Sequence, residues 1–196
     1  HIASCWSLTE EFPLSKDSTE PGYLTPVGDA PEYDKELEKQ LSRWVRGVTG
    51  IAVNLVLPRF TDPQSKIPPN GETWCGFNFS TLSRPGTPAN GQGTEEQSEQ
   101  WSWESIQVLF CFYGPGGSGM ATRFRDGMFV DQNADTLRRI SGLSLVSADD
   151  IRNLPELINN QWVRRYDLAV TLSRKNTRTY NVKSVVDPNV TIVTGD

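Results

Sequence analysis

The sequence predicts an α+β fold in which helices cover one face of a mostly antiparallel β-sheet. Three observations predict it. Apolar residues recur with the 3.6-residue period of an amphipathic helix over 34–48. Apolar and polar residues alternate over 74–81 and 101–113, as in the two strands of a hairpin. Alternation returns over 162–186, so the predicted sheet is a hairpin plus a C-terminal meander.

The first third of the chain contains one clear helix. Residues 1–31 hold four prolines and little periodicity, which predicts an extended N-terminal arm. In the 34–48 helix, acidic residues come early and arginines late, as the helix dipole favours. Residues 51–60 are apolar enough for a short strand that Pro58 ends, and a proline-rich loop is predicted over 62–72.

The predicted hairpin has a long tip. Its first strand, 74–81, turns Cys75, Phe77 and Phe79 toward one face. Its second strand, 101–113, has four inward positions: Ile106, Val108, Phe110 and Phe112. The connecting segment 83–100 is polar without an apolar anchor, which predicts a mobile loop.

Short elements are predicted after the hairpin. Residues 118–130 read as a helix capped by Ser118, and 135–140 as a second short helix. A short strand is predicted over 143–148 and a helix of one or two turns over 153–160.

The predicted meander ends the domain. Its last two strands, 162–172 and 178–186, are expected to pair across the polar turn "SRKNT" at 173–177.

The predicted organisation is therefore one α+β domain with extensions. We expect an arm over 1–31, a single domain over 32–187 that carries the polar loop at 83–100, and a C-terminal tail over 188–196.

Composition excludes several function classes. With 19 basic and 24 acidic residues the net charge is −5, so no general affinity for nucleic acid or anionic membranes is expected. No apolar run is long enough to span a bilayer, and we expect a soluble protein made in the cytoplasm. Three cysteines, Cys5, Cys75 and Cys111, are too few for a disulfide framework and are expected to be reduced. His1 is the single histidine, which excludes histidine-based catalytic triads and multi-histidine metal sites. We therefore expect neither catalytic residues nor a metal or cofactor.

One motif resembles a nucleotide-binding turn. In "FCFYGPGGSGM", Gly114, Gly116 and Gly119 spell G-x-G-x-x-G. A dinucleotide fingerprint needs a parallel, doubly buried strand before it, whereas the strand here alternates, and Asp135, at the distance of the ribose-binding acid, stands at a predicted helix start. A P-loop needs a lysine where Met120 stands. We predict a flexible strand-to-helix corner and keep a small nucleotide-binding enzyme as the less favoured alternative.

Aromatic and basic residues supply candidate contacts with other proteins. Trp101 and Trp103 stand where the polar segment enters the strand, so core packing competes with a protein contact. Arg164 and Arg165 point to opposite faces of a strand, so at least one of them lies outside the core. That arginine is expected either to pair within the fold, with Asp167 or Asp126, or to contact a neighbouring subunit. The candidate interface residues are Trp101, Trp103, Arg123, Arg125, Arg164 and Arg165.

Several sequence blocks together resemble one protein family. The blocks are "GYLTP" (22–26), "LVLPRF" (55–60), "PPNGETWCGF" (68–77), "FYGP" (112–115), "RDGMFVDQN" (125–133), "LPELINNQWVRRYDLAVTL" (154–172) and "RTYNV" (178–182). In combination they are similar to the neck or tail terminator proteins of tailed bacteriophages. The similarity covers most of 22–186 but not the arm or 83–100.

The resemblance implies a structural virion protein without enzymatic activity. Related terminators form a ring, usually a hexamer, at the head-proximal end of the tail, where the ring stops growth of the tail tube. The implied partners are further copies of the chain, the tail tube protein and the head-side connector or stopper. A head-side stopper is the alternative assignment. Assembly in the host cytoplasm is expected.

Two expectations follow for such a ring. DNA passes through it without specific binding, and Glu95, Glu96 and Glu99 are expected to face the lumen and repel phosphate. The 83–100 segment or the N-terminal arm is expected to reach a neighbouring subunit.

Overall fold

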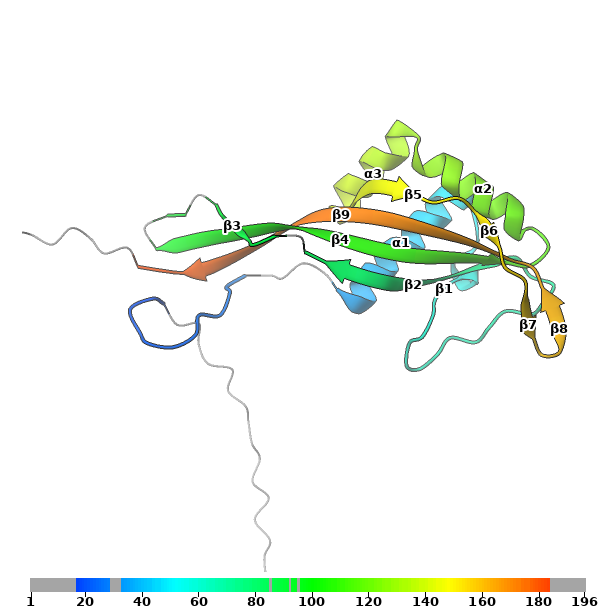
Figure 1. The fold of residues 1–196 in the computed structure, drawn as a ribbon, viewed down its shortest axis with the longest axis horizontal. Helices are drawn as coiled ribbons and strands as arrows, with labels where there is room; N and C mark the ends of the chain where they lie inside the picture. Colours follow the sequence, from blue (N-terminus) through cyan, green and yellow to red (C-terminus); the bar gives the residue numbers. More distant parts are fainter. Residues whose placement is uncertain (1–16, 29–32, 85, 92, 95, 184–196) are drawn as a thin grey trace, which may run out of the picture. The chain divides into compact units, whose positions relative to one another are not determined.

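The computed structural model describes residues 17–28, 33–84, 86–91, 93–94 and 96–183 (Figure 1). The chain forms two compact units, which are described separately. Within the described residues, the small unit comprises 17–28, 88–91, 93–94, 96–101 and 177–183, and the core unit comprises 33–84, 86–87 and 102–176. The predicted tail and the predicted domain limits at 32 and 187 lie outside the described residues, as does most of the predicted arm. The domain limits therefore stay predictions.

Three α-helices and nine strands make up the described residues. In chain order the elements are α1 (Asp34–Thr49), a 3-10 turn (Val53–Leu55), β1 (Val56–Pro58), β2 (Trp74–Ser83), β3 (Ala89–Asn90), β4 (Gln97–Tyr113), α2 (Gly117–Met128), α3 (Asp131–Ser141), β5 (Ser144–Ala148), β6 (Arg152–Asn153), β7 (Glu156–Ile158), β8 (Gln161–Val163) and β9 (Arg165–Asn181).

The main sheet is mostly antiparallel. Its central path is β1-β2-β4-β9-β5, with β3 added beside β4 and β6 beside β9, while β7 and β8 form a separate hairpin. β1 pairs in parallel with β2, and β4 and β5 pair antiparallel with β2 and β9, respectively. The predicted α+β class, with a mostly antiparallel sheet and helices, is confirmed.

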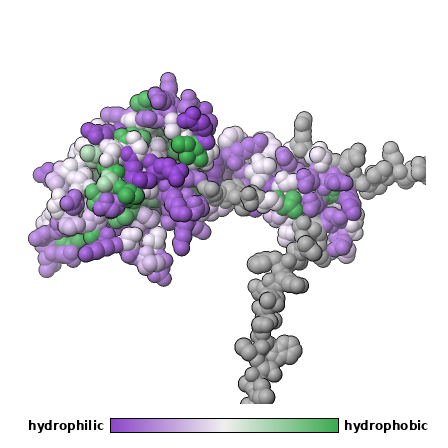
Figure 2. Space-filling view, turned by 180° about the vertical axis from the view of Figure 1, so that it is seen from behind, coloured by the Kyte–Doolittle hydropathy of each residue, from purple (hydrophilic) through white to green (hydrophobic). Residues whose placement is uncertain are grey.

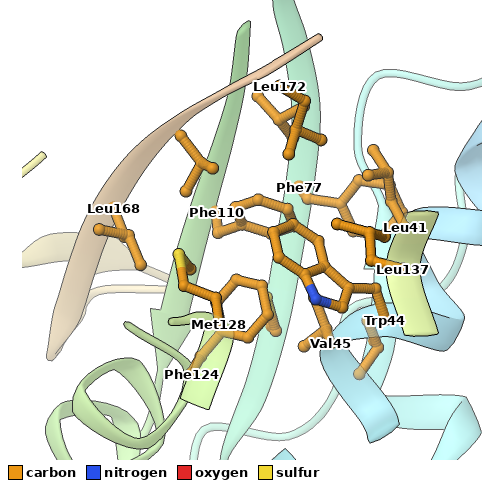
Figure 3. Close-up of a cluster of buried hydrophobic side chains, with 14 of the residues drawn as sticks. Leu41, Trp44, Val45, Phe77, Phe110, Phe124, Met128, Leu137, Leu168 and Leu172 are labelled. Atoms are coloured by element: carbon orange, nitrogen blue, oxygen red, sulfur yellow. The ribbon is translucent and has the colours of Figure 1, made fainter. Parts of the chain in front are cut away.

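Helices cover one face of the sheet in the core unit. The predicted first helix is confirmed as α1, which buries Leu37, Leu41 and Val45, and it ends at Gly50 in the left-handed conformation. Trp44 meets the ring of Phe124 edge-on, with ring centroids 4.8 Å apart (Figure 3). These side chains belong to one apolar core with α2, α3 and the sheet residues of the same face. The inward positions predicted for the second hairpin strand, Ile106, Val108, Phe110 and Phe112, all lie in this core.

The opposite face of the sheet carries a second, smaller apolar cluster. It contains Trp74, Cys111, Tyr113 and Val163, and the rings of Trp74 and Tyr113 stack at 4.2 Å. Val163 comes from β8, so the β7–β8 hairpin covers this end of the sheet. The C-terminal end of β4 is therefore buried on both faces. The sequence of β4 agrees, because no strongly polar residue follows Gln107 in this strand.

The predicted turn at 173–177 is wrong, and with it the predicted pairing of the last two strands of the meander. β9 is one strand of 17 residues from Arg165 to Asn181. Within "SRKNT", Arg174 and Asn176 are buried. A polar segment can continue a strand when its buried side chains find hydrogen-bond or ion-pair partners. Arg174 forms an ion pair with Glu104.

The helix predicted over 153–160 is also wrong. The segment instead enters the β7–β8 hairpin, in which Leu157 lies opposite Trp162. Asn159 and Asn160 adopt φ values of 50° and 60° in the two-residue turn. Asparagine tolerates this left-handed conformation, and two such residues fit the hairpin turn that matches strand twist.

The polar segment is shorter than predicted. β4 begins at Gln97, so 97–100 belongs to a strand that pairs with β3, and the predicted loop is wrong there. In the small unit, the amide of Val182 donates to the carbonyl of Glu96 at 2.9 Å. Backbone pairing explains why these residues form a strand without apolar side chains.

Three further element boundaries differ from the prediction. Of the strand predicted over 51–60, only Val56–Pro58 is extended, after the 3-10 turn. α2 starts at Gly117 with Gly116 at its N-cap position, so Ser118 is inside the helix and is not the cap. α3 starts at Asp131, four residues before the predicted start.

The aromatic core gives a test of the fold. Replacing the fully buried Phe124 with alanine (Phe124→Ala) removes a ring that contacts Trp44, Phe110 and Phe112. We expect a loss of about 3–5 kcal/mol in the free energy of unfolding, measured by urea denaturation. Val146→Ala, at a position 58% exposed on β5, is the control and is expected to change stability by less than about 0.5 kcal/mol. Equal effects of the two substitutions would contradict this core.

Candidate functional site

The glycine-rich turn is a packed corner between β4 and α2. The Gly114 amide donates to the Arg164 carbonyl at 3.2 Å, and the Gly116 amide to Thr73 Oγ1 at 2.9 Å. Gly114 has φ +88°, and a Cβ added there would lie 2.2 Å from the carbonyl oxygen of Glu72. Two amides that a phosphate cradle would need are therefore engaged within the chain. Asp135 lies inside α3 and not at a helix start.

Arg165 joins the β7–β8 hairpin to the sheet. Its Nε and Nη2 donate to the two carboxylate oxygens of Asp167, both at 2.7 Å, and its Nη1 donates to Glu156 Oε2 at 3.1 Å. Tyr113 also donates to that Glu156 oxygen, at 3.1 Å. The hydrogen bonds to Asp167 hold the pKa of Arg165 above its usual value, and burial raises the pKa of Tyr113. Asp167, one of the two partners predicted within the fold, pairs with Arg165. A contact of Arg165 with a neighbouring subunit stays a prediction.

A buried ionic cluster, which sequence analysis missed, lies where the apolar core ends. Glu104 on β4 is 2% exposed, and its Oε2 accepts from Arg174 Nε of β9 at 2.7 Å. Its Oε1 accepts from Tyr33 at 2.9 Å and from Arg84 at 3.1 and 3.2 Å. The Arg174 guanidinium lies 4.5 Å from the centre of the Tyr33 ring, and Asn176 donates to the Tyr33 hydroxyl at 3.3 Å. We call Tyr33, Arg84, Glu104, Arg174 and Asn176 the Glu104 cluster.

The Glu104 cluster had a signal in the sequence. Glu104 falls on the same alternating face as Ile106 and Val108, so the pattern placed a carboxylate on the buried side of β4. Burial alone would raise the pKa of Glu104, but hydrogen bonds from Arg174 and Tyr33 outweigh it and hold the pKa below its usual value. The carboxylate is therefore charged and paired near neutral pH.

Four of the predicted interface residues lie in the core unit besides Arg165. Arg123 donates to the Thr49 carbonyl at 3.2 Å, at the end of α1. Arg125 donates to the Asp149 carbonyl at 3.0 Å. Trp103 and Arg164 are exposed, Trp103 by 52%. The interface role of these four residues stays a prediction. Trp103 and Arg164 are exposed and can therefore be substituted without disturbing the core.

The remaining candidates belong to the small unit. Trp101 is half-buried and lies opposite Ala89 in the β3–β4 pair. Glu96 and Glu99 are exposed, whereas Glu95 lies outside the described residues. Their predicted place in a ring lumen stays a prediction.

The core unit contains a groove and buried free thiols. A groove of about 220 Å³ lies between α1 and α3, and its walls include Trp44, Val48, Leu137 and Ile140. Burial raises the pKa of the free thiol of Cys111 to about 12, so this thiol is protonated at neutral pH. Across the described ranges, no three metal-ligating side chains gather into a possible ion site. No helix in that part of the chain is long and apolar enough to cross a membrane.

The glycine corner predicts unequal effects of two matched substitutions. Gly114→Ala forces a side chain into the left-handed conformation and against the Glu72 backbone, so we expect a loss of more than about 2 kcal/mol in the free energy of unfolding. Gly119→Ala meets no atom within 4 Å inside α2 and is expected to stabilise by up to about 1 kcal/mol. Chemical denaturation of both variants measures the difference; a tolerated Gly114→Ala would refute the packed corner.

The Glu104 cluster predicts a pH dependence of stability. Because the folded pKa of Glu104 lies below its ordinary value of 4.5, charged Glu104 stabilises the fold above about pH 4.5, and this contribution is lost as the pH falls through the folded pKa. Glu104→Gln leaves Arg174 buried without its counter-charge, so we expect a loss of about 3 kcal/mol at pH 7. Below pH 4.5, urea denaturation should show a smaller further loss for Glu104→Gln than for the unsubstituted protein. Parallel pH profiles of the two proteins would contradict the role of Glu104.

Comparison with known proteins identifies the family. A search of the curated proteins found no match to the chain. The model of the family described as "Phage neck terminator protein" matches residues 35–196, which run from the second residue of α1 past the end of β9. The match agrees with the resemblance of the sequence blocks and with a structural role in the neck or tail of a phage particle. The chain therefore belongs to the phage neck terminator protein family.

Proposed function

We propose that the chain assembles into a closed ring, a hexamer, at the head-proximal end of the phage tail. There the ring stops growth of the tail tube and joins the tail to the head-side connector. The observation that carries this proposal is the family match over 35–196. The tail tube protein, the connector or stopper and further copies of the chain are the proposed partners, and the ring is assembled in the host cytoplasm.

The surface of the core unit supports an assembly role. Large apolar side chains are exposed at separate places, among them Phe60 by 82% and the facing pair Leu157 and Trp162 by 54% and 75%. On the face shown in Figure 2, apolar surface occurs in patches among hydrophilic surface. Single exposed apolar side chains are common on soluble domains, whereas a contiguous exposed apolar patch, such as the Leu157–Trp162 pair, is typical of a protein contact. The engaged amides of Gly114 and Gly116 count against the alternative of a nucleotide-binding enzyme.

We further propose that DNA passes through the ring without specific binding. The net charge of −5 disfavours adhesion of phosphate. Glu96 and Glu99 are exposed in the small unit, as lumen-facing acids must be, and Glu95 completes the proposed set. A ring structure with these acids on its outer rim would contradict this assignment.

Assembly and tube termination can be measured together. Light scattering of the purified chain, alone and after addition of purified tail tubes, should detect a species of about six times the chain mass. Tubes polymerised in the presence of the chain should stop growing at the end that the ring occupies, as seen by negative-stain microscopy. A chain that stays monomeric with tubes, and tubes that continue to grow, would overturn the proposal.

A further inference from the structure

We infer that neighbouring copies of the chain bind head to tail, with the β7–β8 hairpin of one copy against the α2–α3 corner of the next. The inference rests on the proposed ring and names the surfaces that close it. Two patches of the core unit carry it, one apolar and basic and the other apolar and acidic.

The first surface, the hairpin patch, consists of Leu157, Trp162 and Arg164. Leu157 and Trp162 lie directly opposite each other on β7 and β8 and are 54% and 75% exposed. Val163 points inward and is buried, so alternation turns Trp162 and Arg164 outward together. The Glu156–Arg165 ion pair holds the hairpin on the sheet. A large aromatic side chain on a fixed hairpin is the residue type that dominates protein interfaces.

The second surface, the corner patch, consists of Asp126, Phe129, Val130 and Asp131. Phe129 and Val130 connect α2 to α3 and are 53% and 52% exposed. The corner is held in place, because the side chain of Asn133 donates to the Gly127 carbonyl at 2.8 Å. Asp126 and Asp131 are exposed on either side of the apolar pair.

The charges of the two patches are complementary. Among the residues that the structure describes, neither Arg164, Asp126 nor Asp131 forms an ion pair through its side chain. Contact of the two patches would place Arg164 near these carboxylates and the Leu157–Trp162 pair on Phe129 and Val130. Apolar surface would then leave water, and the free charges would gain partners.

The positions of the patches decide the symmetry. The hairpin packs on the cluster that contains Trp74 and Tyr113, whereas α2 and α3 pack on the opposite face of the sheet. Figure 1 shows the hairpin below the sheet of the core unit and α2 and α3 above it. The two patches therefore lie on opposite sides of one copy, where each patch can bind a different neighbour. A copy that binds one neighbour at each patch makes the heterologous contact that a closed ring requires.

Truncation of the hairpin patch tests the contact. Under the conditions in which the unsubstituted chain forms a ring, alone or on tail tubes, Trp162→Ala should weaken subunit association by at least about tenfold, measured by light scattering across a dilution series. Val146→Ala truncates another exposed apolar side chain, 58% exposed and outside both patches, and should leave association unchanged. Unchanged thermal melting of both variants shows that the fold is intact.

Charge reversal tests the pairing itself. Arg164→Glu and Asp131→Arg should each weaken association by about tenfold, because each places like charges against each other. The two substitutions on one chain again set opposite charges at positions 164 and 131 in every contact of the ring, while Asp126 keeps its charge. The double variant should therefore associate more tightly than either single variant.

The outcomes separate this inference from the proposed function. A ring that forms equally well with Trp162→Ala, or a double charge variant that associates no more tightly than the single variants, would overturn the hairpin–corner contact and leave the ring standing. An unsubstituted chain that forms no ring with tail tubes would overturn both.

Discussion

The buried ion pair between Glu104 and Arg174 is the constraint on which the rest of the core unit depends. It joins β4 to β9 where the apolar core ends, and Tyr33 and Arg84 complete it from the start of α1 and the end of β2. A buried carboxylate is costly unless it is fully hydrogen-bonded. Four separate segments must therefore be in register before the charge is compensated, which favours one arrangement of the strands over its shifted alternatives.

The sequence predicted what local periodicity determines and missed what distant partners determine. α1 and the hairpin of β2 and β4 follow from the spacing of residues such as Leu41 and Phe110, because a single buried face imposes that spacing. The continuation of β9 through Arg174 depends on Glu104, 70 residues away, which no local pattern shows. The β7–β8 hairpin depends on Asn159 and Asn160, which adopt the left-handed conformation in its turn. The local pattern instead predicts a helix over 153–160, because a proline near the start of a segment is typical of a helix.

The candidate surfaces were predictable only in part. Trp103 and Arg164 are exposed and their interface role stays a prediction. Arg165, next to Arg164 in the sequence, is bound to Asp167 and Glu156 inside the unit. Trp162 was not singled out, since alternation alone does not reveal whether a tryptophan meets the core or solvent. The glycine turn shows the converse, because a motif typical of nucleotide binding is a packed corner once Gly114 is placed against Glu72. Family membership and these surfaces together support assembly.

Cryo-electron microscopy of the neck of the phage particle tests the central claim most directly. The account predicts a closed ring of copies of this chain between the end of the tail tube and the head-side connector, with each copy in contact with two neighbours. Density for the chain away from the tube end, or as a single copy without neighbours of its own kind, would contradict the account.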